Sequence, residues 1–153
     1  MNYWLMKSEP AELSIDDLRA KKHWHWDGVR NYEARNFMRD QMHIGDLVIF
    51  YHSNGNPTGP AGVARVASSP YPDFTQFNKK SKYYDAKATT EKPIWVMVDV
   101  AFVKQFARTI TRDELRATPV LRNMTLWKRG RLSITPLAKK EFDAICRLGD
   151  KLK

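Results

Sequence analysis

Hydrophobic and polar residues follow two different periods along the chain, and together these periods predict short strands mixed with short helices. Residues 2–6 alternate with a period of two, since Trp4 and Met6 face opposite to Tyr3 and Leu5. This alternation predicts a strand near the start of the chain, with apolar side chains on both of its faces.

Three further segments have the composition of strands. Residues 47–52 are apolar on both faces, and after a dense run of turn residues 62–67 return as a second strand. Residues 94–103 are the most strongly apolar segment, which predicts a central strand. Asp99 interrupts this segment, so we expect its carboxylate to meet a cation or to lie near the end of the sheet.

Capping signals predict four short helices, each opened by a side-chain oxygen that can accept a backbone N–H. The predicted N-caps are Ser14, Asn31, Thr111 and Thr135. The helix that follows Asn31 is expected to run to about Met42. Pro136 favours the first position of the last helix, and Gly149 is placed to end it.

The order of strands, hairpins and helices predicts an α+β fold: a curved mixed sheet or small β-barrel flanked by short helices. The 153 residues are expected to form one domain, residues 1–153, because no repeat, low-complexity tract or linker divides them. Residues 68–92 are a long irregular excursion without clear periodicity, and such segments are often functional.

The net charge of the chain and its distribution indicate the class of binding partner. The chain carries 26 Lys and Arg against 17 Asp and Glu, for a net charge of +9. Most of the excess lies in residues 101–153, which hold 13 basic and 5 acidic side chains. A basic region of this kind indicates a polyanion such as DNA or RNA, because neutralising phosphates attracts any sequence.

The sequence does not support several other classes of protein, such as metal-binding proteins, nucleotide or serine hydrolases, and secreted or membrane proteins. A single cysteine, Cys146, excludes an internal disulfide, and the four histidines match no common zinc pattern, so we expect no metal and no cofactor. Neither a phosphate-binding glycine loop nor a nucleophile elbow is present. With no signal peptide or membrane span expected, the predicted location is intracellular: cytoplasmic in a bacterium, nuclear in a eukaryote.

Aromatic residues are frequent outside the predicted strands and helix stripes, where their rings could stack on a planar base. These residues are Trp24, Trp26, Tyr71, Phe74, Tyr83 and Tyr84. We expect Trp24 and Phe74 to cover the core, and Trp26 and one of Tyr83 and Tyr84 to form a pocket.

Five collinear strings carry a family resemblance over residues 3–148. They are Trp4-Leu5-Met6-Lys7-Ser8-Glu9-Pro10, Trp26-x-Gly28-Val29-Arg30-Asn31-Tyr32-x-Ala34-Arg35-Asn36, Phe50-Tyr51-His52-Ser53-Asn54, Pro93-x-Trp95-x-x-Val98-Asp99-Val100 and Arg131-Leu132-Ser133-Ile134-x-Pro136-Leu137. Together they resemble the EVE domain family. The resemblance implies a PUA-like fold, related to the YTH readers of methylated RNA, and a pocket for modified bases in DNA or RNA, with modified cytosine the leading candidate.

The resemblance also implies two groups of site residues, one that binds the base and one that contacts phosphates. Those expected to form the base-binding pocket, by stacking or by hydrogen bonds to the base edge, are Ser8, Trp26, Asn31, Tyr32, Ser53, Asn54, Tyr83 and Tyr84. Those expected to contact phosphates are Lys7, Arg30, Arg35, Lys128, Arg129 and Arg131. Arg39 and Arg122 can extend this basic surface, although an exposed, solvated role explains Arg39 at least as well.

Two alternatives stay open beside a non-catalytic reader. Residues 28–35 resemble the Gly-x-Lys-x-x-Glu-x-Arg motif of ASCH domains, some of which hydrolyse acylated cytidine. Here Arg30 replaces the lysine, and a guanidinium stays protonated, which leaves Glu33 alone to activate a water. The second alternative is a backbone binder without base selectivity. We rank the reader first.

Overall fold

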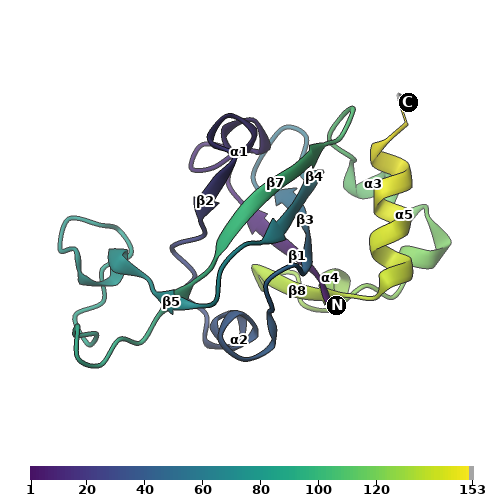
Figure 1. Cartoon of the computed structure of the whole chain (residues 1–153). Helices are drawn as coiled ribbons and strands as arrows, with labels where there is room; N and C mark the ends of the chain where they lie inside the picture. Colours follow the sequence, from purple (N-terminus) through teal and green to yellow (C-terminus); the bar gives the residue numbers. More distant parts are fainter. Residues whose placement is uncertain (152–153) are drawn as a thin grey trace.

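The computed structural model describes residues 1–151 and has a curved, open six-stranded sheet at its centre (Figure 1). Its strands are β1 (Tyr3–Ser8), β2 (His23–His25), β3 (Leu47–His52), β4 (Gly59–Val66), β7 (Asp99–Gln105) and β8 (Ile134–Leu137), in the order β2-β7-β4-β3-β1-β8. Strands β1 and β3 are parallel and the other neighbours antiparallel. Strands β5 (Tyr71–Pro72) and β6 (Val96–Met97) form a separate small ribbon.

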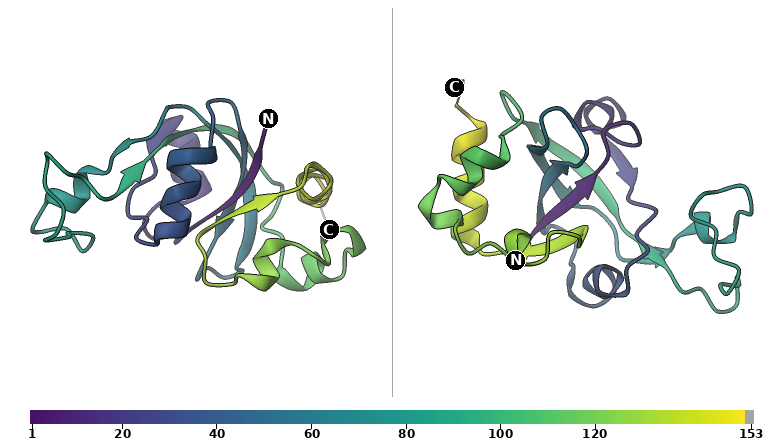
Figure 2. Two further views of the ribbon diagram at one scale, coloured as in Figure 1. Left: turned by 90° about the horizontal axis from the view of Figure 1, so that it is seen from below. Right: turned by 180° about the vertical axis from the view of Figure 1, so that it is seen from behind.

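Helices cover both faces of the sheet, as the two further views show (Figure 2). The helical segments are α1 (Ile15–Lys21), α2 (Tyr32–Asn36), the π-helix η1 (Phe37–Gln41), the 3₁₀-helix η2 (Phe74–Phe77), α3 (Arg112–Arg116), the 3₁₀-helix η3 (Pro119–Leu121), α4 (Thr125–Lys128) and α5 (Lys139–Gly149). Helices α1 and α2 pack on one face, and α3, α4 and α5 pack on the other.

The alternation of the first strand explains this arrangement. Trp4 and Met6 belong to the buried cluster under α1 and α2, whereas Leu5 belongs to the cluster under α3 to α5. Phe50 and Ile49 divide in the same way on β3. Because both faces of the central strands are buried, both need apolar side chains, and the predicted two-faced strands and α+β class are confirmed.

Three of the four predicted N-caps are confirmed, at Ser14, Asn31 and Thr111. The fourth is wrong: Thr135 and Pro136 lie inside β8. A proline is tolerated there because β8 is an edge strand, paired on one side with β1. Helix α5 begins instead after Ala138, whose backbone N–H donates to Glu141 Oε1 at 2.8 Å.

The segment predicted as one central strand is divided. Val98 separates β6 from β7, and β7 lies between β2 and β4, next to the edge of the sheet. Asp99 opens β7 and accepts a 2.5 Å hydrogen bond from Tyr71 Oη, so the expectation that it lies at the sheet end is confirmed. The aromatic segment around Trp24, for which no strand was predicted, is the edge strand β2.

Two aromatic residues expected to cover the core do not. Trp24 is 37% exposed and Phe74 is 52% exposed, so that expectation was wrong. Their rings instead lie against the His25 ring, at 4.5 and 4.8 Å between centroids. Trp24 lies on the edge strand β2, which leaves part of its ring open to solvent, and Phe74 lies in η2 outside the six-stranded sheet.

The capping box of α3 gives a pH-dependent prediction. Arg108 makes a bidentate ion pair with Glu114, whose carboxylate also accepts the Thr111 backbone N–H, and these contacts lower the pKa of Glu114 from 4.5 to about 2. A lowered pKa in the folded state stabilises the protein above the unfolded value, and the contribution is lost as the pH falls towards 2.

We expect Glu114→Gln to reduce the free energy of unfolding by about 1 kcal/mol at pH 7. The difference from wild type should shrink below pH 4.5 and vanish near pH 2, as measured by urea unfolding across this range. Asp113→Asn, one residue earlier on the same helix, is the matched control, with little expected change. A difference for Glu114→Gln that is independent of pH would contradict the assignment.

Candidate functional site

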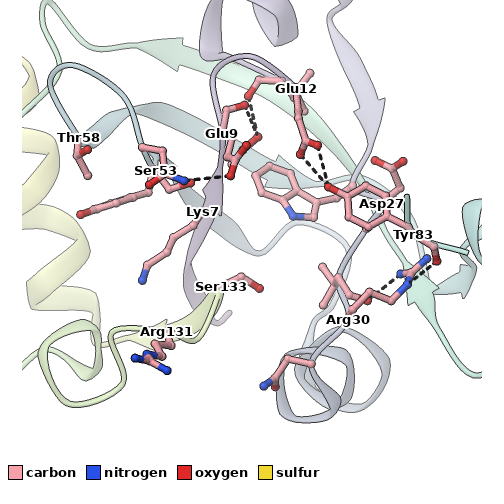
Figure 3. Close-up of a pocket in the computed structure, with 18 of the residues that line it drawn as sticks. Lys7, Glu9, Glu12, Asp27, Arg30, Ser53, Thr58, Tyr83, Arg131 and Ser133 are labelled. Carbon is pink, nitrogen blue, oxygen red and sulfur yellow. Dashed lines mark hydrogen bonds between the residues drawn. The ribbon is translucent and has the colours of Figure 1, made fainter. Parts of the chain in front are cut away.

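An open cavity of about 820 Å³ lies where the parallel strands β1 and β3 end (Figure 3). Its walls come from the end of β1 and the residues that follow it, from β2 and the segment after it, from the end of β3 and the loop that follows, from the loop around residue 83, from the start of α3 and from the loop before β8. The polar and aromatic lining residues on which the following argument depends are Lys7, Ser8, Glu12, Trp26, Asp27, Gly28, Arg30, Asn31, Tyr51, Ser53, Asn54, Tyr83, Arg112, Arg131 and Ser133.

Strand register brings the polar edge groups together. Ser8 pairs with His52 in the parallel ladder, and the Ser53 N–H donates to the Ser8 carbonyl at 2.9 Å. The Ser8 hydroxyl donates to the Leu13 carbonyl at 2.7 Å, so its proton is already used. Ser53 Oγ has no hydrogen-bond partner among residues 1–151 and can both donate and accept.

The two asparagines differ in what they offer to a ligand. Asn31 Oδ1 accepts the Ala34 N–H as the N-cap of α2, while its Nδ2 donates to none of the described residues. Asn54 Nδ2 donates to Glu9 Oε1 at 3.0 Å. Within the cavity, Asn31 therefore presents an unused donor, and Asn54 presents an amide that is already held.

Of the aromatic residues expected to form the pocket, Trp26 and Tyr83 line the cavity. Trp24, which was expected to cover the core, lines the cavity as well. Trp26 is only 5% exposed, and its ring packs edge-on against Phe50 with 5.3 Å between centroids. Trp26 thus forms the floor and belongs mainly to the core. Tyr83 is half-buried and is the member of the Tyr83-Tyr84 pair that faces the cavity.

Tyr83 is held in place from three sides. Its ring lies on Gly28, where an added Cβ would come within 2.7 Å of the ring. Gly28 has φ +83°, a conformation that favours glycine, so both the space and the backbone require it. The Tyr83 hydroxyl lies 2.9 Å from Glu12, and Arg30 Nε donates to the Tyr83 carbonyl at 3.0 Å.

Arg30 has little freedom left to bind phosphate, although it lines the cavity. Its guanidinium also donates to the Val29 carbonyl, to Asp73 Oδ2 and to Thr75 Oγ1, at 2.9 to 3.1 Å. A phosphate must displace one of these partners to reach it. The geometry gives Arg30 a structural role in positioning Tyr83.

A buried polar network under this loop was missed by the sequence analysis. Asp73 is fully buried and accepts hydrogen bonds from the Gly28 N–H at 2.8 Å, from Arg30 and from Thr75. Gln76, also fully buried, donates to the Trp95 carbonyl and accepts from the Trp95 N–H. The sequence shows only an aspartate and, three residues later, a glutamine within an irregular segment. These two residues do not predict a buried network unless their hydrogen-bond partners are known.

Five predicted site residues do not line the cavity: Lys128 and Arg129 lie beside it, and Tyr32, Arg35 and Tyr84 lie elsewhere. Tyr84 is 38% exposed, and Tyr32 is 57% exposed and stacks on Trp95 with 4.8 Å between centroids. The Arg35 guanidinium lies over the Tyr32 ring and donates to the Ile94 carbonyl at 3.1 Å. Tyr32, Arg35 and Trp95 form a separate stack, and neither this stack nor Tyr84 shares the cavity with Trp26.

The remaining basic residues lie beside the cavity. Lys128 and Arg129 line a smaller adjoining hollow of about 240 Å³, together with Asn31 and Arg131, which line both hollows. Arg129 forms a 2.6 Å ion pair with Glu33. Glu33 is therefore held at the surface by a cation and does not line the cavity.

Charge is polarised along the cavity. Lys7 and Arg131 lie at one end (Figure 3). Glu12, Asp27 and Tyr83 lie at the other, where the charge of Arg30 is paired with Asp73. Burial raises the pKa of the Asp27 carboxyl, an effect that His25 opposes and Asp73 reinforces. Burial, together with the nearby Arg112 cation, lowers the pKa of Lys7. A ligand that fits this cavity should be anionic at one end and carry hydrogen-bond donors at the other.

Within residues 1–151 there is no group of three or more histidine, cysteine or acidic side chains that could hold a metal ion. None of the helices in this part of the chain is long and apolar enough to cross a membrane.

A curved mixed sheet flanked by short helices, with an open polar cavity at the ends of its parallel strands, defines a PUA-like domain. Sequence comparison gives the family. The EVE domain profile matches residues 2–148, and the chain belongs to this family.

Individual relatives agree with this assignment. Human thymocyte nuclear protein 1 is 43% identical over 98% of this chain and 75% of its own length. A solved hypothetical protein from Leishmania major is 48% identical, with a TM-score of 0.95 over 98% of this chain and 95% of that chain. Human THYN1 protein, solved in complex with DNA containing 5-methylcytosine, is 42% identical, with a TM-score of 0.93 over the full length of both chains.

Proposed function

We propose that this protein is a non-catalytic reader of modified cytosine in DNA, with 5-methylcytosine as its first candidate. The observation that carries the proposal is the cavity, in which an aromatic floor and wall, free edge donors and unpaired cations meet. A relative with the same fold, 42% identical, was solved in complex with DNA containing 5-methylcytosine. RNA is the alternative polymer, and the same cavity chemistry suits both.

The residues supply the functions that recognition of an extruded base requires. A base inside a duplex is inaccessible, so it must be flipped and then held by stacking and by its edge. Trp26 and Tyr83 offer ring surface, while Ser53 Oγ and Asn31 Nδ2 offer hydrogen bonds. Phosphate contacts from Lys7, Arg131 and their neighbours supply affinity without base selectivity.

The hydrolase alternative is weaker because the two residues on which it depends, Glu33 and Arg30, are already engaged by other residues. Glu33, the candidate base, is ion-paired with Arg129 and lies outside the cavity lining. Arg30 replaces the lysine of the ASCH motif and donates to four partners. Turnover of acylated cytidines that is lost in Glu33→Gln would favour this alternative.

The test is a comparison of oligonucleotides of one sequence that differ at one base: 5-methylcytosine, cytosine or thymine. Burial of one methyl group is worth about 0.8 kcal/mol, so we expect 5-methylcytosine to bind about fourfold more tightly than cytosine, by fluorescence anisotropy. Thymine carries the same methyl with a reversed hydrogen-bonding edge, and it should bind more weakly than 5-methylcytosine. Equal affinities for all three would favour a selectivity-free backbone binder and contradict the proposal.

A further inference from the structure

Three cations at one end of the cavity have no acidic partner among the residues that the structure describes. Lys7, Arg112 and Arg131 all line this cavity, and none of them forms an ion pair within residues 1–151. Other arginines of residues 1–151, Arg65 and Arg116 among them, also have no ion pair, so what sets these three cations apart is that they line one cavity. Like charges gathered without counter-charge are costly, and an anion placed between them removes that cost.

The cations reach this point from three separate parts of the fold. Lys7 comes from β1 and its ammonium donates to the Gly130 carbonyl at 2.6 Å. Arg131 follows in the same loop, which places it beside Lys7 (Figure 3). Arg112 opens helix α3, with its guanidinium 5.6 Å from the Trp127 ring centroid. Convergence from distant segments distinguishes this end from a merely solvated charge run.

A buried hydroxyl gives a second, independent observation. Tyr51 is 1% exposed, lines the cavity, and its Oη makes no hydrogen bond of ordinary geometry with the described residues. Burial raises the pKa of Tyr51, and the Arg112 guanidinium lies close enough to the hydroxyl to oppose that rise. Lys7 Nζ lies 5.8 Å from the Tyr51 ring centroid. A buried polar group without a partner is unfavourable, and in native proteins it often marks the place of a missing ligand. A phosphate oxygen is a suitable acceptor for this hydroxyl.

We propose that Lys7, Arg112 and Arg131 form a subsite for one phosphodiester group, the one attached to the nucleotide whose base is read beside Trp26 and Tyr83. This inference rests on the proposed function and adds to it the orientation of the bound nucleotide in the cavity. The base lies at the acidic and aromatic end of the cavity, and its own phosphate lies at the cationic end. Arg112, for which the sequence analysis predicted no role, contacts this phosphate.

The chain offers a matched pair of variants for the test. Arg112 and Arg116 lie on the same helix and both contact the Trp127 ring, but only Arg112 lines the cavity. We expect Arg112→Gln to weaken binding of a 5-methylcytosine oligonucleotide roughly tenfold and to reduce the salt slope of log affinity by about 1. Arg116→Gln should change neither quantity.

A neutral methylphosphonate, placed at single positions in the oligonucleotide, locates the contact. Replacing the phosphate attached to the modified nucleotide should weaken wild-type binding by a similar factor and leave Arg112→Gln binding almost unchanged. Full additivity of the two changes would overturn the subsite, as would equal effects of Arg112→Gln and Arg116→Gln. If wild type prefers 5-methylcytosine but Arg112→Gln binds normally, only the phosphate subsite fails; if wild type shows no preference, the proposed function fails.

Discussion

Asp73→Asn is expected to destabilise the protein by about 3 kcal/mol, the lower end of the cost of breaking a buried ion pair. Asp73 is fully buried and accepts from Arg30, Thr75 and the Gly28 N–H. Without the carboxylate, Arg30 keeps a largely buried charge that has lost its ionic partner. For a chain of this size the change corresponds to a fall in melting temperature of roughly 6–12 °C, measurable by circular dichroism.

Asp40→Asn is the matched control for this experiment. Asp40 is also paired with an arginine, Arg39, but both side chains are about half exposed, and exposed pairs contribute little to stability. We expect its melting temperature to equal that of wild type. If Asp73→Asn melted at the same temperature as Asp40→Asn, the network under Tyr83 would not be a structural anchor.

The second large effect is expected from Tyr83→Ala. Base stacking on an aromatic side chain is worth about 1–3 kcal/mol, so affinity for the 5-methylcytosine oligonucleotide should fall roughly fivefold to 150-fold. Tyr83 is half-buried and anchored at its edges, and removing the ring should cost far less stability than removing Trp26, which belongs to the core. Affinity can therefore be measured on a folded protein.

Tyr84→Ala is the control, since the neighbouring ring lies outside the cavity lining and is 38% exposed. Tyr83→Phe keeps the ring and removes only the contact with Glu12, so it should bind nearly as well as wild type. Titrations of the three variants by fluorescence anisotropy test whether the Tyr83 ring stacks on the base. Similar losses for Tyr83→Ala and Tyr84→Ala would contradict a specific stacking role for Tyr83.

Local signals predicted the elements of the fold well because their causes are local. A Ser, Asn or Thr side chain caps the helix that follows it within three residues, and the period of two in β1 sorts Trp4 and Leu5 onto opposite faces. The failure at Thr135 has a clear cause. A threonine followed by a proline is tolerated in an edge strand as well as at the start of a helix. Only the pairing of β8 with β1 decides which of these two structures forms.

The candidate site could be predicted in its residue types but not in its geometry. Ser8, Trp26 and Ser53 belong to recognisable strings, and the structure places all three on one cavity. Tyr32 and Arg35 belong to the same strings, yet they stack with Trp95 outside the cavity lining. Neighbours in sequence on a helix point in different directions, so membership of a motif does not establish membership of a pocket.

The sequence by itself determined the family, through the resemblance of five collinear strings. It also determined the α+β class and the excess of basic residues, because periodicity, capping and charge are properties of short segments. The tertiary structure alone decided that Tyr83, and not Tyr84, faces the cavity, that Arg30 is held by Asp73, and that Arg112 joins Lys7 and Arg131. Each of these depends on contacts between residues far apart in the chain, whose distances follow from packing and strand register and not from local pattern.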